Sequence, residues 1–156
     1  MTTTPPNTPD GLATPAQIEA LADQLSACAD AIHARVIKAL AVYKGGPVPE
    51  QEQSTARALI DDELLLRQRA DGLYADAATL VVKSLGKPQQ HVMQLTADAA
   101  QKIAKINHLA QVASLVGSLL SFAGAVGTGQ PLVIVKALDN VRKHIKVMQP
   151  PPPTPG

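Results

Sequence analysis

Apolar residues recur along this chain at alternating steps of three and four, and glycine and proline interrupt that pattern at three places, which predicts four helices. The helices are expected over residues 15–44, 50–85, 88–126 and 131–149. At about 1.5 Å per residue, the first three would each span roughly 45 to 55 Å and the fourth about half of that. The pattern therefore predicts an all-α fold, an elongated antiparallel bundle of three long helices plus a shorter C-terminal helix.

Local signals mark the ends of these helices and of the domain. Thr14 and Gln17 have the spacing of a capping box, and Pro15 fits the first turn of a helix, where a missing N–H costs nothing. Gly86 is expected in the left-handed conformation that closes a helix. Residues 1–13 and 150–156 are rich in proline and poor in apolar residues, so we expect tails that are disordered or polyproline-like on both sides of one helical-bundle domain at residues 14–149.

One long segment has no charged residue. From Ile106 to Val135 there is no Asp, Glu, Lys or Arg, and residues 109–126 have about the length at which a helix spans a hydrocarbon core. Two apolar stripes run along this segment, one through Ile106 and Gly117 and the other from Leu109, so it should lie either at the centre of the bundle or in lipid. Small residues at every fourth position permit close helix packing in membranes and in soluble bundles alike, so they do not separate these two alternatives.

The uncharged segment and the basic helix after it form the candidate contact surface for a membrane or a protein partner. Only residues 132–135 are apolar after the glycine turn, which excludes a second membrane span. Basic residues beside an apolar segment suit an anionic lipid surface, and they equally suit the C-terminal half of any helix. The candidate contact residues are Leu109, Val112, Val116, Gly117, Leu119, Leu120, Phe122, Gly124, Val126, Lys136, Arg142, Lys143 and Lys146.

Composition and charge narrow the class of protein. Hydrophobic residues make up 46% of the chain but aromatic residues only 2%, so the core must consist of Ala, Leu, Val and Ile, and bases of a nucleic acid would find few stacking partners. The single cysteine, Cys28, lies on the first apolar stripe and is expected to be a small buried residue. Residues 1–82 contain six basic and eleven acidic residues, whereas residues 83–156 contain eight basic and two acidic ones, so the two halves should attract each other.

The sequence contains no pattern typical of a catalytic, cofactor or metal site. No histidine has a second histidine three to five residues away, so a local zinc site cannot form. Glu63 is the one charged residue on the apolar stripe of the second predicted helix, residues 50–85, and we expect it to pair with an arginine or reach water. An enzyme would require distant residues such as Glu63, His108 and His144 to converge in one pocket.

We therefore expect a non-enzymatic helical bundle without a cofactor that acts through protein association, as a scaffold, an accessory subunit or a self-assembling component. The alternative is a membrane-active protein that inserts or docks the apolar hairpin from Leu109 to Val135 on an anionic membrane, similar in outline to helical pore-forming proteins. Residues 1–14 have no Lys, Arg or apolar run, so no secretory signal is expected and a cytoplasmic location is favoured, or a membrane-associated one under the alternative. The alanine-rich composition is compatible with a bacterial origin.

Overall fold

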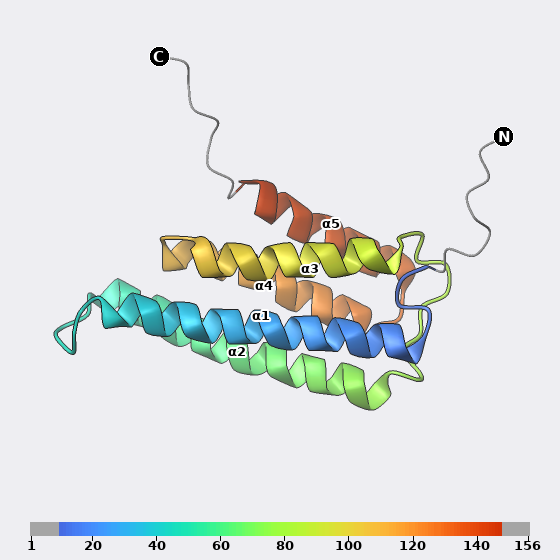
Figure 1. Ribbon diagram of the computed structural model, residues 1–156, viewed down its shortest axis with the longest axis horizontal. Helices are drawn as coiled ribbons and strands as arrows, with labels where there is room; N and C mark the ends of the chain where they lie inside the picture. Colours follow the sequence, from blue (N-terminus) through green and yellow to red (C-terminus); the bar gives the residue numbers. More distant parts are fainter. Residues whose placement is uncertain (1–9, 148–156) are drawn as a thin grey trace, which may run out of the picture.

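The computed structural model describes residues 10–147, in which every regular element is a helix (Figure 1). This part of the chain contains α1 (Pro15–Ala41), α2 (Glu50–Asp76), α3 (Gln89–Lys105), α4 (Leu109–Val126) and α5 (Pro131–Val147). The predicted all-α class is confirmed. The expected number of helices is wrong, because the described residues form five helices and not four. Residues 1–9 and 148–156 lie outside the described residues, and the C-terminal tail predicted at 150–156 is among them.

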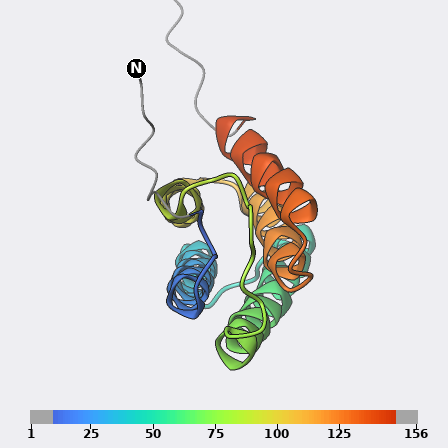
Figure 2. The same ribbon diagram turned by 90° about the vertical axis from the view of Figure 1, so that its right-hand side faces the viewer.

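The other four helices pack around α4. α1 and α2 form one antiparallel hairpin and α4 and α5 form another, while α3 lies along α1 and closes the bundle against α5 (Figures 1 and 2). α4 touches each of the other four helices. α2 and α5 flank α4 on opposite sides and do not touch each other. One side of α4 therefore faces the core, and the other faces outward between α2 and α5.

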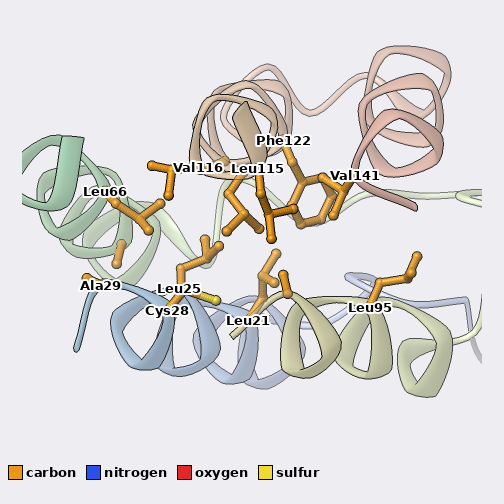
Figure 3. Packing of buried hydrophobic residues seen from close by; sticks show 14 of the residues in the cluster. Leu21, Leu25, Cys28, Ala29, Leu66, Leu95, Leu115, Val116, Phe122 and Val141 are labelled. Atoms are coloured by element: carbon orange, nitrogen blue, oxygen red, sulfur yellow. The ribbon is translucent and has the colours of Figure 1, made fainter. Parts of the chain in front are cut away.

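The core is built around the inward side of α4. Leu115, Val116 and Phe122 of α4 point toward Leu25 of α1 and its neighbours (Figure 3), and all four side chains are fully buried. Phe122 is the largest buried side chain in the described part of the chain. Burial of each such side chain contributes about 1.5 to 3 kcal/mol to stability, so the central position of α4 explains its apolar composition.

The first helix begins as its sequence predicts. The side chain of Thr14 accepts a hydrogen bond from the backbone N–H of Gln17, the Gln17 side chain accepts one from the N–H of Thr14, and Pro15 occupies the first turn. Cys28 is fully buried among apolar side chains, and its thiol lies 3.4 Å from the carbonyl oxygen of Thr96 on α3. Burial raises the pKa of the Cys28 thiol to about 12, so it is protonated at neutral pH.

The second helix is shorter than expected, since it ends at Asp76 and not near residue 85. The chain makes one more turn there, in which the N–H of Thr79 bonds to the carbonyl of Asp76 at 2.9 Å, and then leaves the helix. Further along, the N–H of Val82 bonds to the carbonyl of Leu12 at 2.8 Å, and the N–H of Gly11 bonds to the carbonyl of Lys87 at 2.7 Å. We call residues 10–13 together with 77–88 the end clasp; Leu12, which lies within the expected N-terminal tail, is fully buried there.

The third predicted helix is divided in two by an extended break at residues 106–108. Ile106 and His108 have extended backbone conformations, with ψ of 135° and 124°. The buried guanidinium of Arg35 on α1 donates hydrogen bonds to the carbonyls of Ile106 and Asn107 at 2.7 and 2.8 Å. These carbonyls are thus satisfied outside a helix, which stabilises the break. Because the helix stops at Lys105 and starts again at Leu109, the faces of α4 do not continue those of α3. The stripe that starts at Leu109 therefore faces the core.

Candidate functional site: the outer face of α4

The predicted contact residues of α4 divide into a buried set and an outward set. Most of their apolar members are buried in the core, namely Leu109, Val112, Val116, Leu119, Phe122 and Val126. Gly117 is exposed, and Leu120 and Gly124 are half-buried. The large apolar side chains of this helix are therefore already covered by the protein itself.

The outward side of α4 is a stripe of small residues without charge. Its positions alternate in steps of four and three, as expected for one face of a helix, and they are exposed or half-buried. They are Ala110, Ser114, Gly117, Ser121 and Gly124. This stripe lies between α2 and α5, which pack on its two sides, and shallow hollows line both of its edges; we call the stripe the floor, the two helices the walls, and the whole the α4 trough.

Four hollows lie along the α4 trough. The two between α4 and α5 have volumes of about 460 and 630 Å³, and the two between α4 and α2 have volumes of about 350 and 300 Å³. Lys143 lines both hollows on the α5 side, so it stands beside the middle of α4. On the α2 side, Thr55 lies beside Ala110 at one end and Leu65 beside Ala123 toward the other. α2 and α4 therefore run in the same direction, while α5 runs opposite to them.

Large apolar side chains are exposed on the walls of the trough. Leu65 on α2 is 38% exposed, and Val133 and Val147 on α5 are 41% and 83% exposed. Each of these three lines one of the hollows against α4. Exposed apolar side chains that surround a depression are typical of a surface that contacts another molecule.

The two walls carry opposite charge. Among the charged residues that line the hollows or share their face, α2 has Glu52, Asp62 and Asp76 against Arg69, and α5 has Lys136 and Lys143 against Asp139. Asp62 of α2 precedes Leu65 by three residues and Arg69 by seven, which places it on the trough side of α2. Within the described residues neither Asp62 nor Lys143 makes a salt bridge. Partial burial and the neighbouring Asp61 raise the pKa of the Asp62 carboxyl, as expected for an acid without a cationic partner.

The predicted basic residues of α5 also divide into two groups. Lys136 and Lys143 line the hollows between α4 and α5. Arg142 and Lys146 are exposed but line neither of these two hollows. The cationic side of the trough is thus formed by Lys136 and Lys143.

The residues that an enzyme would have needed together are separated. Glu63 accepts hydrogen bonds from His33 and Arg67 at 3.0 Å each, on the side of α2 that faces α1, so it pairs with an arginine as expected. His108 precedes α4 and lines a hollow with the start of α2, while the Nδ1–H of His144 donates to the carbonyl of Asn140 within α5. Across residues 10–147 there is no group of three or more His, Cys, Asp or Glu side chains that could hold a metal ion.

Sequence reasoning found the helix of the site but missed its outward members Ala110, Ser114 and Ser121. A signal for them was present, because the stripe through Ile106 and Gly117 continues in steps of three and four along α4. That stripe was expected to lie, with the rest of one continuous helix, either at the centre of the bundle or in lipid. The break at residues 106–108 turns it outward instead.

Comparison of this chain with protein-family models, with curated proteins and with solved structures gives no match. In the described part of the chain one helix, Leu109–Val126, has the length and composition needed to cross a membrane, with a mean hydropathy of 1.7, and 56% of it is buried in the bundle. A function can therefore be proposed only from the residues and geometry of the chain itself.

Proposed function

We propose that this protein acts by binding another protein molecule in the α4 trough, as a component of an assembly and not as an enzyme. The observation that supports this most strongly is the character of the outward face of α4. Its own side chains are small and uncharged, with the Arg69 guanidinium beside it only at Gly124, and exposed apolar side chains lie on the walls. A helix or helical pair can approach such a floor closely and cover apolar area, which favours association.

The hollows do not resemble a site for a small molecule. They are open depressions distributed along the whole length of α4, whereas ligand sites are concave, largely enclosed and contain a few convergent polar groups. The only buried charged side chains among the described residues, Arg35 and Glu63, already have partners in structural roles. These features favour a protein partner over a substrate.

A photo-reactive group at one exposed position of the floor tests this proposal. Ser121→Cys allows attachment of the group in the trough, and Ala27→Cys on the exposed side of α1 is the matched control. Irradiation in the native host should yield a covalent adduct to protein from Ser121→Cys and not from Ala27→Cys. Equal protein labelling from both positions, or none from either, would contradict the proposal.

A second candidate function is membrane insertion, because α4 is apolar, has 18 residues and is bounded by non-helical residues at both ends. Insertion would require α4 to leave the bundle, since its large apolar side chains face the core. Flotation with anionic liposomes at neutral and mildly acidic pH separates the two candidates. Membrane activity requires that the wild-type protein floats and that folded Gly117→Glu does not, whereas the proposed association predicts no flotation in either case.

A further inference from the structure

We propose that the molecule bound in the α4 trough is a second copy of this chain, docked trough against trough with the two α4 helices side by side and parallel. This inference rests on the proposed function, because it names the partner for the same surface. In this arrangement each α2 lies on the α5 of the other copy, and the two-fold axis runs along α4.

The floor of the trough permits this close approach. Gly117 lies at the middle of α4, and a Cβ atom added to it would meet no heavy atom within 4 Å. Alanine and serine occupy the neighbouring exposed positions at Ala110, Ser114 and Ser121. Small side chains let two helix axes come to about 8 Å, the short end of the usual range, so two such floors can pack directly against each other.

The charge of the walls selects the orientation. When two copies meet face to face, their two-fold axis must lie in the plane between them. An axis perpendicular to α4 would place α2 on α2, with the trough-side acids Glu52, Asp62 and Asp76 on each, and would place the basic side of α5 on itself. An axis along α4 places α2 on α5 at both edges of the interface. Opposite charges then face each other, and like charges are kept apart.

Specific residues then meet across the interface. α2 lies beside α4 with Thr55 near one end and Asp76 near the other, so Asp62 stands at the level of the middle of α4. Lys143 stands at the same level on the opposite wall, because it lines both hollows on the α5 side. The parallel arrangement brings Asp62 of one copy to Lys143 of the other. It therefore supplies each of these charges with the partner it lacks within the described chain.

Exposed apolar side chains also match. Leu65 on α2 and Val133 on α5 both stand beside the C-terminal third of α4, on opposite walls. In the parallel arrangement Leu65 of one copy therefore faces Val133 of the other, and both lose their exposure to water. An antiparallel arrangement would carry these two side chains to opposite ends of the interface.

The size of the trough predicts a weak dimer. The 18 residues of α4 make a floor about 27 Å long, and one helix spacing on each side makes it about 20 Å wide, so each copy buries roughly 500 Å². The total of roughly 1,000 Å² lies at the lower end of specific interfaces. We therefore expect a monomer–dimer equilibrium that depends on protein concentration.

Engineered cysteines test the orientation. In the parallel pair, position 114 of one copy lies opposite position 114 of the other, and the same holds for position 121. Ser114→Cys alone and Ser121→Cys alone should therefore each form an interchain disulfide under mild oxidation. In an antiparallel pair these two positions would meet each other, and only a mixture of the two variants, distinguished by a tag, would cross-link efficiently. Ala27→Cys on α1 is the matched control for random collision. Cys28 does not interfere, because it is fully buried and protonated.

Charge reversal tests the pairing. Asp62→Lys and Lys143→Glu should each weaken dimerisation at least tenfold in sedimentation equilibrium, because each places like charges opposite each other. The double variant Asp62→Lys/Lys143→Glu should recover most of the wild-type affinity, since it restores opposite charges in reversed order. Glu19→Lys, at an exposed position of α1, changes charge equally and should leave the dimer unchanged. Additive losses in the double variant would overturn the pairing.

The failure of this inference can be told from the failure of the proposed function. If Ser114→Cys and Ser121→Cys cross-link no better than Ala27→Cys, while the photo-reactive group at position 121 labels a different protein, the second copy is wrong and the proposed function stands. If that group labels no protein, both are wrong. Cross-linking only in the mixture of the two cysteine variants keeps the second copy but overturns the parallel orientation.

Discussion

Arg35 should be among the most important polar residues for stability, because it holds the break between α3 and α4. Its side chain is 9% exposed, its Nε donates to the carbonyl of Ile106 at 2.7 Å, and a terminal nitrogen donates to the carbonyl of Asn107 at 2.8 Å. Replacement by alanine removes both hydrogen bonds and the packing of the side-chain stem. Ile106 is itself only 8% exposed, so its carbonyl loses a partner that water cannot easily replace.

The size of this effect follows from the two bonds. A hydrogen bond from a charged donor to a buried carbonyl contributes about 1.5 to 3 kcal/mol, and the bond to the exposed Asn107 contributes less, about 1 kcal/mol, because water competes there. We therefore expect Arg35→Ala to lower the free energy of unfolding by about 2 to 4 kcal/mol. Arg35→Lys should lose about half as much, since one ammonium group cannot serve both carbonyls in the same planar geometry.

Urea denaturation followed by far-ultraviolet circular dichroism measures this loss, since the chain has no tryptophan for fluorescence. Lys38→Ala, three residues further along α1 and exposed, is the control and should change stability by less than about 0.5 kcal/mol. Hydrogen exchange should also show faster exchange at the start of α4 in Arg35→Ala. A loss below about 1 kcal/mol would show that the break does not depend on Arg35, and that its two bonds contribute only what exposed bonds do.

Three further outcomes are expected. Gly117→Ala should raise the stability of the monomer by about 0.5 to 1 kcal/mol in thermal melts at low protein concentration, because the position is helical and open; no gain would indicate a hidden contact. At low protein concentration, where the protein is monomeric, Asp62→Asn should stabilise it at neutral pH, since a raised folded-state pKa makes the ionised carboxyl unfavourable, and the gain should vanish below about pH 4, where the unfolded acid is also protonated; a gain independent of pH would refute this cause. Cys28 should react with a disulfide reagent only at the rate of unfolding, and rapid reaction of the native protein would contradict its burial.

The sequence predicted best where local signals and apolar spacing agree. In α1 the capping pair Thr14 and Gln17, the proline after the cap and the apolar stripe all act within a few residues, and the helix begins at the expected residue. Gly86 adopts the expected left-handed conformation with φ of 77°, but it does not close α2 as predicted, because that helix already ends at Asp76. These features depend on neighbours in the chain, which a sequence displays directly.

The errors arise from contacts between residues far apart in the chain. The break after α3 depends on Arg35, which is 71 residues from Ile106, and the early end of α2 accompanies a hydrogen bond between Val82 and Leu12. Nothing in the local spacing shows either contact. The position of the candidate site also depends on such a contact. Two stripes were visible along α4, and the break at residues 106–108, which Arg35 holds, decides which of them faces the core.

The end clasp also sets an order of assembly. Its bond between the N–H of Gly11 and the carbonyl of Lys87 joins residues 76 positions apart (87 − 11), so forming it requires closure of a long loop. The helical hairpins involve mainly nearby residues and can form sooner. The clasp should therefore close late in folding and open early in the native state, as should the break that Arg35 holds across 71 residues. Proteases would then reach residues 77–88 in molecules whose helical hairpins are still folded.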